Sequence, residues 1–311
     1  MKYDAIIIDT MNVFYRVSEF KNESSSLVSK KKVYKQSICN FIKKIDEIVE
    51  EHSYHDADIY LLFDNPTSRV ELNSAFMYAG RKEISPDYKA NRTKEPKEFY
   101  NSIGLIRYYY LLKPANYRCL VATRLEADDL VKPLLRNELK DKSVLLVSND
   151  LDWAKEITEK VHWLKKWNEI VEPEQLSLSL DFHATEASLI AYKALYGDSS
   201  DNIPSILPAK TFHEFQELAA SIHNPLDLID WSNSNKAREK HPMLIVLKAA
   251  ERQYRINVQL VDSIPVADQH LGHIIAKGRD SEELRIIVEQ AVGFRTAPKV
   301  YEFGNVKRSR I

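Results

Sequence analysis

Five continuous apolar segments of strand length constrain the fold of this 311-residue chain most strongly. They lie at residues 5–8, 59–63, 119–122, 144–147 and, as a candidate fifth, 161–164. Between the first two, apolar residues recur at intervals of three and four from Ile38 to Val49, which predicts a helix with one buried stripe. Such strands alternating with helices are typical of a parallel sheet covered on both faces. The sequence therefore predicts an α/β fold with a mostly parallel sheet, and residues 211–311 add a mostly helical C-terminal region.

Acidic residues follow the predicted strands at the points where the strands end. Asp9, Asp64 and Asp150 come directly or almost directly after apolar segments, and Glu126 comes a few residues after another. Ligands of open α/β sheets bind at the carboxyl ends of the strands, so these side chains should meet at one edge. With neighbouring acids and those of the turn at residues 197–204, the candidates are Asp9, Asp64, Glu126, Asp128, Asp129, Asp150, Asp152, Asp198 and Asp201. A single such acid can simply cap a helix, but acids at four strand ends predict a shared site.

Carboxylates that converge in this way repel one another unless cations bind between them or some of them take up protons. Hard oxygen ligands, without cysteine or suitably spaced histidine, suit magnesium or manganese. The candidates outnumber the ligands that one octahedral ion uses, which indicates two ions. Paired ions activate the attacking water and stabilise the leaving oxygen in phosphodiester hydrolysis. We therefore expect two Mg²⁺ ions, for which Mn²⁺ can substitute.

Basic residues concentrate in one segment although the net charge of the chain is only −1. Residues 81–97 contain three acids and six cations, namely Arg81, Lys82, Lys89, Arg92, Lys94 and Lys97. Tyr88 lies among them. Cations hold phosphates and an aromatic ring can stack on a displaced base, so the segment predicts contact with nucleic acid. A solvated, charged helix start would have a similar composition.

The overall composition excludes several classes of protein. Hydrophobic residues make up 44% and charged residues 29% of the chain, as in ordinary globular proteins. Cys39 and Cys119 lie far apart without metal-ligand spacing, which favours a reducing, cytoplasmic setting and argues against a zinc site. No apolar run approaches the ~18–20 residues that span a bilayer, and residues 1–4 lead directly into a strand. We expect no membrane partner and a cytoplasmic location, which would be the host cytoplasm for a viral protein.

The ordered motifs resemble the 5′-nuclease family, which includes phage flap endonucleases, phage-type ribonuclease H and the 5′-nuclease domain of bacterial DNA polymerase I. The resemblance rests on I-D-T-M-N at residues 8–12, F-D-N-P at 63–66, P-D-Y-K-A-N-R at 86–92, E-A-D-D at 126–129, S-N-D-L-D at 148–152 and G-D-S-S-D-N-I-P at 197–204. It covers roughly residues 4–210. It implies a PIN-like domain that cuts DNA, and often RNA–DNA hybrids, from 5′ ends or at 5′ flaps with two magnesium ions.

The resemblance also implies which acids hold which ion. The first ion would be surrounded by Asp9, Asp64, Glu126, Asp128 and Asp150. The second would be held by Asp150, Asp152, Asp198 and Asp201, some of them through water. Asp129 would either join the metal ligands or, as a residue of the first helical turn, only favour the helix dipole.

For the basic segment, the resemblance implies contacts with the substrate. Lys89 and Arg92 would clamp the scissile phosphate or stabilise its developing charge, and Tyr88 would stack on a base. These three residues are the candidate catalytic side chains outside the acids. Further contacts with nucleic acid are expected from Arg69, Arg81, Lys82, Lys94 and Lys210.

Two departures from the family pattern concern the substrate. Only 33 residues separate Arg92 from Glu126, so the basic arch, at about residues 81–113, would be short. After residue 204 the chain lacks the family's glycine-rich hairpin, whose backbone N–H groups approach duplex phosphates, and a potassium site is therefore not expected. We predict a catalytic domain at residues 1–178 and a mostly helical DNA-binding domain at residues 179–311 that carries the turn at 197–204.

The leading hypothesis is a magnesium-dependent 5′-nuclease of phage type, acting as a 5′-3′ exonuclease or flap endonuclease with RNase H-type primer removal. Its partners would be DNA with 5′ ends or flaps, RNA–DNA hybrids and replication proteins. Two alternatives stay open, a PIN-type ribonuclease on single-stranded RNA and a catalytically weak protein that binds particular DNA structures. A HAD-type phosphatase also begins with a strand-end Asp, but it needs a second Asp where this chain has Met11.

Overall fold

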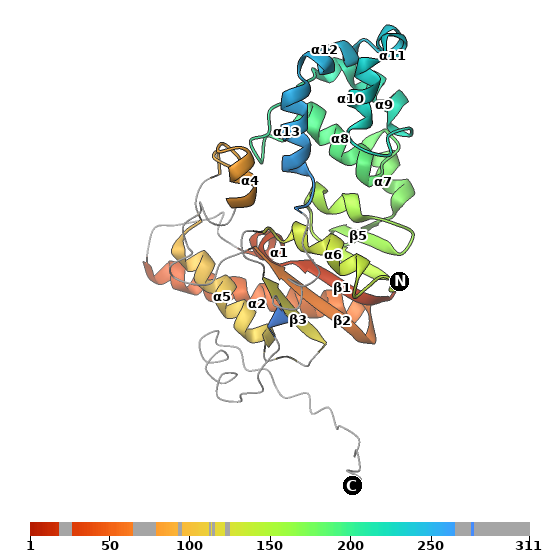
Figure 1. The fold of residues 1–311 in the computed structure, drawn as a ribbon. Helices are drawn as coiled ribbons and strands as arrows, with labels where there is room; N and C mark the ends of the chain where they lie inside the picture. Colours follow the sequence, from red (N-terminus) through yellow and green to blue (C-terminus); the bar gives the residue numbers. More distant parts are fainter. Residues whose placement is uncertain are drawn as a thin grey trace, which may run out of the picture.

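A sheet with the strand order β6-β5-β4-β1-β2-β3-β7 forms the centre of the structure (Figure 1). Its strands are β1 (Tyr3–Asp9), β2 (Ser53–Phe63), β3 (Tyr117–Val121), β4 (Val144–Val147), β5 (Val161–Lys166), β6 (Glu169–Val171) and β7 (Ile275–Ala276). Strands β1 to β5 pair in parallel, and β6 and β7 add an antiparallel strand at either edge. The predicted mostly parallel sheet is confirmed.

This computed structural model describes residues 1–18, 27–64, 79–92, 95–111, 113, 116–121, 125–264 and 275–276. The predicted nucleic-acid contacts at Arg69 and Lys94 lie outside these ranges. Within them, no helix is long and apolar enough to cross a membrane.

Helices cover both faces of the sheet because successive residues of its buried strands point to opposite sides. Ile6 and Ile8 pack with α1 (Thr10–Val17), α2 (Leu27–His52) and α5 (Lys97–Leu111). Ala5 and Ile7 lie in the second core, with residues of α6 (Val131–Arg136) and of the C-terminal helices. Because both faces are covered, the strands carry continuous apolar runs rather than alternating polar residues.

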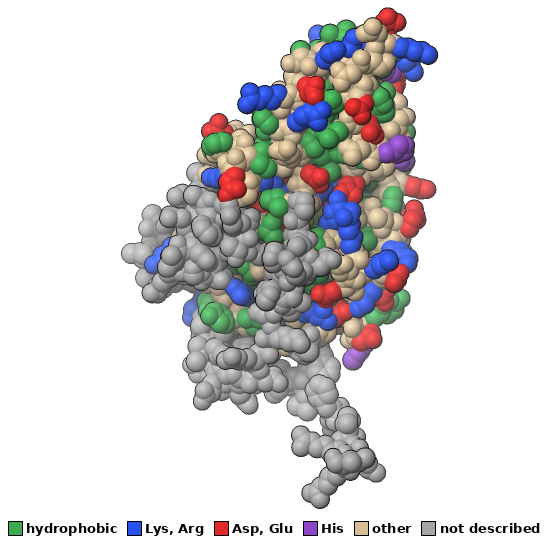
Figure 2. Space-filling model, in the orientation of Figure 1, with side chains coloured by type: hydrophobic (Ala, Val, Ile, Leu, Met, Phe, Trp, Pro, Cys, Tyr) green, Lys and Arg blue, Asp and Glu red, His purple; other side chains and the backbone are tan. Residues whose placement is uncertain are grey.

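The C-terminal part of the described chain is helical, as predicted, and extends beyond one face of the sheet (Figure 1). It contains α7 (Pro173–Leu180), α8 (Glu186–Tyr196), α9 (Phe212–Ala219), α10 (Asp227–Asn233), α11 (Asn235–Lys240), α12 (Met243–Ala249) and α13 (Glu251–Val261). Figure 2 shows Lys and Arg side chains interspersed with Asp and Glu over these helices. The described side chains in that view therefore form no broad, uniformly basic surface.

The register of the strands places several strand ends side by side. Ile8 of β1 lies opposite Val147 of β4, and Asp9 lies opposite Leu62 of β2. The chain continues from those neighbouring strands into Ser148 and Asp64. The backbone register of the sheet is therefore sufficient to bring the strand-end acids to one edge.

The turn that follows α8 is closed by two backbone hydrogen bonds between Asp198 and Ile203, with N–O distances of 3.0 and 2.9 Å. Gly197 begins this turn with φ = 78°, a left-handed conformation that side chains rarely tolerate. A Cβ atom there would lie 2.7 Å from the Ile203 carbonyl oxygen and from the Ser205 nitrogen. Glycine is thus required for the chain to leave α8 and enter this turn.

We expect Gly197→Ala to lower the free energy of unfolding by more than about 1 kcal/mol, because the added methyl group meets backbone atoms and the left-handed φ disfavours alanine. Gly104→Ala is the matched control. Gly104 lies within α5 with open space around its Cα, so alanine there should be neutral or stabilising by up to about 1 kcal/mol. Urea unfolding of both variants tests this, and equal stability of the two would contradict it.

Candidate active site

Asp9 links the ends of two neighbouring strands. It caps α1 by accepting a hydrogen bond from the Asn12 backbone nitrogen at 3.1 Å. Its other oxygen accepts from the Ser148 hydroxyl at 2.9 Å, directly after β4. The expectation that a strand-end acid can cap a helix is met, and the same carboxylate also lies within the acidic group. Capping and participation in a site are compatible here.

Asp64 links β2 to the segment that contains the E-A-D-D motif. Its carboxylate accepts a hydrogen bond from the Ala127 backbone nitrogen at 2.8 Å. Burial raises the pKa of Asp64, and the nearby charge of Asp128 raises it further, against the opposing effect of Lys89. The structure therefore brings Asp64 and Asp128 together although 63 positions separate them in the chain.

Burial and mutual repulsion raise the pKa of several acids at this edge. The pKa of Asp9 lies well above its ordinary value because the group is buried and because Asp64 and Asp150 are close. Burial and the neighbouring Asp152 raise the pKa of Asp150 to about 6. Burial raises the pKa of Glu126 to about 7 even though Lys89 and Arg81 oppose the shift. Without a bound cation these carboxylates tend to hold protons, which is the electrostatic condition of a cation site.

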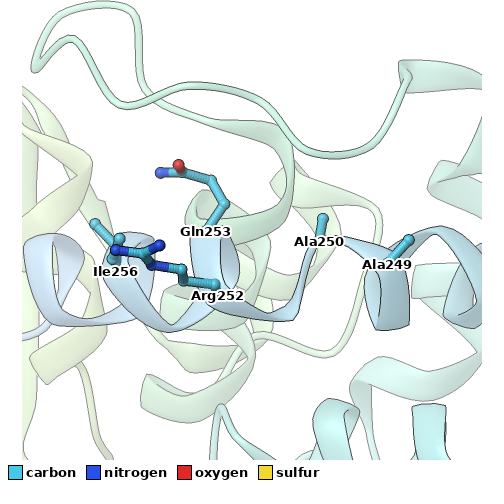
Figure 3. A pocket seen from close by; sticks show the side chains of 5 residues that line it. All are labelled: Ala249, Ala250, Arg252, Gln253 and Ile256. Atoms are coloured by element: carbon cyan, nitrogen blue, oxygen red, sulfur yellow. The ribbon is translucent and has the colours of Figure 1, made fainter.

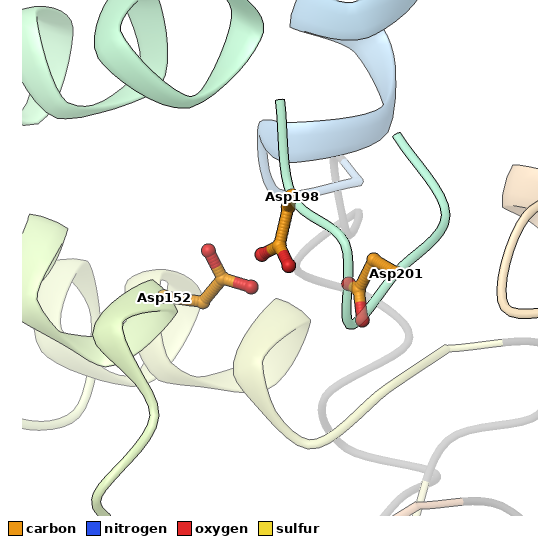
Figure 4. A group of neighbouring side chains, drawn as sticks. All are labelled: Asp152, Asp198 and Asp201. Atoms are coloured by element: carbon orange, nitrogen blue, oxygen red, sulfur yellow. The ribbon is translucent and has the colours of Figure 1, made fainter. Parts of the chain in front are cut away.

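A second acidic group lies beside the first. Asp152, Asp198 and Asp201 each offer one carboxylate oxygen, and these oxygens lie within 4.8 Å of one another (Figure 4). Asp152 belongs to a 3₁₀ helix after β4 (Leu151–Glu156), whereas the other two lie on the turn after α8. The turn therefore brings its acids to the strand-end acids, as the sequence predicted, and all three are oxygen donors suited to a divalent ion.

Lys193 of α8 joins the second group and was not anticipated from the sequence. Its ammonium contacts the Asp152 carboxylate and lies 2.7 Å from an oxygen of Asp198. Burial alone would raise the pKa of Asp152, but Lys193 and Lys155 lower it to about 2. The pKa of Asp198 is also lowered, mainly by Lys193 against the effect of burial. Asp152 and Asp198 thus have lowered pKa values because Lys193 lies between them, whereas the pKa values of Asp9, Asp64, Glu126 and Asp150 are raised.

The basic segment at residues 81–92 lies against both acidic groups. Lys89 adopts a left-handed φ of 53°, and its backbone nitrogen donates to the Asp201 carbonyl oxygen at 2.9 Å. Its ammonium lies 2.8 Å from both carboxylate oxygens of Glu126. The Arg92 guanidinium donates to Asp201 at 2.6 Å and remains partly exposed. Both cations therefore lie at the acids, where they can reach a phosphate bound there.

The predicted stacking role of Tyr88 is corrected by its burial. Its side chain is only 1% exposed, so no base can stack on the ring in this arrangement. The hydroxyl instead donates to Asp201 at 3.0 Å and is 3.2 Å from Glu126. Tyr88 connects the two acidic groups, because a phenol between carboxylates satisfies oxygen lone pairs that burial removes from water.

The predicted nucleic-acid contact at Arg81 is likewise corrected. Arg81 lies at the start of the basic segment, in α4 (Ala79–Ile84), and is 2% exposed. Its guanidinium forms two hydrogen bonds with Asp129, at 2.8 and 3.0 Å, and donates to the carbonyl oxygens of Leu260 and Asp262. A phosphate cannot reach it there. The basic composition of the segment did not distinguish this buried cation from exposed ones.

Asp129 also departs from its candidate role as a metal ligand. It is fully buried, and its oxygens accept hydrogen bonds from Arg81 and from the backbone nitrogens of Glu126 and Ile264. These contacts engage both oxygens away from the shared acidic site. The structure gives Asp129 a structural role that holds the E-A-D-D turn in place, and its oxygens are therefore not available to a metal ion.

The remaining predicted contacts are more peripheral. Lys82 is partly exposed on α4, and Lys210 is exposed in a short 3₁₀ helix (Ala209–Thr211). A buried asparagine that the sequence did not single out has a clearer role. The Asn257 amide on α13 donates at 2.8 Å to the carbonyl oxygens of both Ala194 and Pro204. It holds the two ends of the turn that carries Asp198 and Asp201.

A cavity of about 440 Å³ borders both acidic groups through Asp150 and Asp198. Its lining consists of Asn149, Asp150, Leu151, Tyr192, Lys193, Gly197, Asp198, Ser199 and Ser200. A second cavity, of about 450 Å³, lies where α12 meets α13 (Figure 3). Ala249, Ala250, Arg252, Gln253 and Ile256 line it, and they include no acid or nucleophile. The first cavity is therefore the candidate active site.

Comparison with known proteins agrees with this geometry. The family model of the 5′-3′ exonuclease N-terminal resolvase-like domain matches residues 4–181, which is more than half of the chain. The chain belongs to this family of nucleases.

Particular relatives extend the likeness along the chain. The 5′-3′ exonuclease of Buchnera aphidicola subsp. Schizaphis graminum (strain Sg) is 28% identical over 228 residues, which are 72% of this chain and 74% of the relative. The thermostable DNA polymerase I of Thermus caldophilus is 26% identical over 276 residues, which are 86% of this chain but 30% of the polymerase. A structure of the bacteriophage T5 flap endonuclease in a pseudo-enzyme–product complex with DNA and metal ions has a TM-score of 0.59 at 21% identity, covering 93% of this chain and 99% of that one. This last likeness shows the shared fold.

We expect Arg81→Met to lower the free energy of unfolding by about 3–5 kcal/mol, because it leaves the buried Asp129 charge without its partner. Arg255→Met is the control. Arg255 pairs with Glu251 at 2.7 Å on the exposed face of α13, where such a pair contributes less than about 1 kcal/mol. Chemical unfolding measures both losses. A nucleic-acid contact at Arg81 would instead lower DNA affinity while stability stayed unchanged, which would contradict the structural role.

Glu156 is a buried residue at the end of the 3₁₀ helix Leu151–Glu156, and it makes the stability of the fold depend on pH. Burial raises the pKa of Glu156 to about 7 from 4.5, with Lys155 opposing the shift. The folded state then retains a proton that the unfolded chain releases, so stability falls as the pH rises from 4.5 through 7. The difference in free energy of unfolding between Glu156→Gln and wild type should therefore shift by about 3 kcal/mol in favour of the variant when the pH is raised from 4 to 8. Unfolding at both pH values tests this, with the exposed Glu159→Gln as a control that should show no such gain.

Proposed function

We propose that this protein is a divalent-metal-dependent 5′-nuclease that hydrolyses phosphodiester bonds in DNA with 5′ ends or flaps, during replication or repair. The observation that carries the proposal is the convergence of strand-end acids at one edge of the sheet, next to the group formed by Asp152, Asp198 and Asp201. A cavity that Asp150 and Asp198 line lies at this edge. The basic residues Lys89 and Arg92 contact the same acids. Membership of the 5′-3′ exonuclease family supports the same class of reaction.

The donor chemistry of the site fits two magnesium ions, with manganese as a substitute. Candidate ligands of the first ion are Asp9, Asp64, Glu126, Asp128 and Asp150, and those of the second are Asp150, Asp152, Asp198 and Asp201. All are carboxylates, and burial together with mutual repulsion favours cation binding among the first group. Bound ions of this kind activate a water molecule and stabilise the leaving oxygen.

The chain's own residues would orient the phosphate. Lys89 and Arg92 present an ammonium and a guanidinium at the edge of the acidic site, and fixed cations stabilise charge that develops on a phosphoryl group. Tyr88 fixes Glu126 and Asp201 relative to each other through its hydroxyl. Lys210, exposed after the turn, is a further candidate contact with a phosphate of the substrate.

The proposed organisation places the catalytic domain at residues 1–178, with the basic region at about 81–113, and a helical DNA-binding domain at residues 179–311. RNA–DNA hybrids, RNA primers and replication proteins belong to the same proposal as further substrates and partners. A panel of 5′-labelled substrates would test it: a flap, a nicked duplex, an RNA–DNA hybrid and single-stranded RNA, each with and without Mg²⁺. Preference for single-stranded RNA would favour the PIN-type ribonuclease, and no metal-dependent cleavage would favour a DNA-binding protein.

We expect Asp150→Asn to reduce Mg²⁺-dependent cleavage of the 5′-labelled flap by at least about a hundredfold. Even residues that only support metal ligands cost 10–100-fold when they are replaced. Removing a charge from a repulsive buried group should leave the free energy of unfolding unchanged or higher in the absence of metal. The exposed Asp141→Asn is the control and should cleave like wild type. Cleavage by Asp150→Asn at a near-wild-type rate would refute the site assignment.

A further inference from the structure

Lys193 lies where a cation of the second acidic group would bind. It occupies the last turn of α8, one turn before Gly197. Its side chain is 8% exposed and extends between Asp152 and Asp198. The carboxylates of these two residues point toward each other in Figure 4. The ammonium therefore bridges two of the three acids whose oxygens lie within 4.8 Å of one another.

A divalent ion and this ammonium need the same oxygens. Magnesium binds carboxylate oxygens at about 2.0–2.1 Å and demands near-octahedral geometry. The Lys193 nitrogen is 2.7 Å from Asp198 and also contacts Asp152. Two cations that share both carboxylates at these distances would repel each other strongly. Occupation by the lysine and occupation by a metal ion are therefore alternatives.

In the first acidic group, Asp9 and Asp64 accept hydrogen bonds from neutral donors. Asp9 accepts hydrogen bonds from a backbone nitrogen and from the Ser148 hydroxyl. Asp64 accepts from the Ala127 backbone nitrogen. These donors to Asp9 and Asp64 are neutral, and the cations of the first group, Lys89 and Arg81, lie instead at Glu126 and Asp128. In the second group Lys193 contributes a full positive charge directly between two acids. The two halves of the site therefore differ in where the groups that compensate their negative charge lie before a metal ion binds.

We infer that the Lys193 ammonium is a built-in counter-ion of the second half-site, which a divalent ion must displace from Asp152 and Asp198. The inference rests on the proposed function, because it requires metal ions at these carboxylates. Displacement of Lys193 would make the two divalent ions bind in sequence. The strand-end half-site takes an ion first, and the Lys193 half-site fills only at higher metal concentration.

Mn²⁺ titration of the metal-free, full-length protein tests this, with free Mn²⁺ measured by electron paramagnetic resonance. Wild type should bind one ion tightly and a second ion more weakly. Lys193→Gln should tighten the second affinity by about tenfold or more, since a loss of 1.4 kcal/mol of competition corresponds to tenfold. Lys193→Arg keeps the charge and should keep the second ion weak. Lys193→Met gives the same comparison if the glutamine variant does not fold.

Lys132→Gln is the matched control. Lys132 of α6 pairs with Glu186 at the first turn of the same helix α8, away from the acids of the site. This variant should lose an ion pair to α8 and yet bind both Mn²⁺ ions like wild type. A thermal readout accompanies the titration. The melting temperature of metal-free Lys193→Gln should fall below that of wild type, and Mn²⁺ should raise it by more.

The outcomes separate the inference from the proposed function. If wild type binds Mn²⁺ and cleaves the flap but the neutral Lys193 variants leave the second affinity unchanged or weaker, the inference is overturned and the nuclease proposal stands. Equal tightening by Lys193→Arg would also overturn it, because the charge would then not be the competitor. If wild type neither binds Mn²⁺ nor cleaves any substrate of the panel, both fail together.

Discussion

Repulsion among buried carboxylates at the end of a parallel sheet is the constraint on which the rest of this structure depends. The strand register brings Asp9, Asp64 and Asp150 to one edge, and burial raises the pKa of each. Buried charges are tolerated only with partners. The chain accordingly places Arg81, Lys89, Arg92 and Lys193 against the neighbouring acids. The basic segment thus balances internal charge as well as offering cations to a substrate.

The end of α13 holds these charged segments in their relative positions. Asn257 binds both ends of the turn after α8, and the Leu260 carbonyl oxygen accepts from Arg81. The Val261 carbonyl oxygen accepts from Lys155, and the Ile264 nitrogen donates to Asp129. Residues 257–264 therefore contact four separate parts of the acidic site. The helical C-terminal region determines the geometry of the site as much as the sheet does, because it fixes the loops that the strand ends leave free.

The sequence was sufficient for the sheet and for the acids, because both depend on local patterns. Continuous apolar segments predict buried strands, and an acid after each strand end falls on the same edge by topology alone. The roles of Arg81, Tyr88 and Asp129 could not be predicted, since their exposure and their partners depend on contacts between residues that lie 38 to 181 positions apart. Lys193 lies outside the motifs, and the local sequence assigns no role to Asn257. Their significance comes only from what tertiary packing places opposite them.

Two buried cations of the site, Arg81 and Lys193, also differ in how permanently they are held. The planar guanidinium of Arg81 binds Asp129 through two hydrogen bonds and also donates to two carbonyl oxygens. All three of its nitrogens are therefore engaged. The ammonium of Lys193 is a point charge on a flexible stem and is bound to the carboxylates of Asp152 and Asp198. Lys193 and Asp198 also line the cavity. Replacing Arg81 would require rebuilding the packing between α4 and α13. Displacing Lys193 requires only rotation of its side chain and a competing charge. Repulsion among the acids is thus relieved in two ways. Arg81 forms a fixed ion pair with Asp129, and Lys193 forms ion pairs with Asp152 and Asp198 that a metal ion can replace.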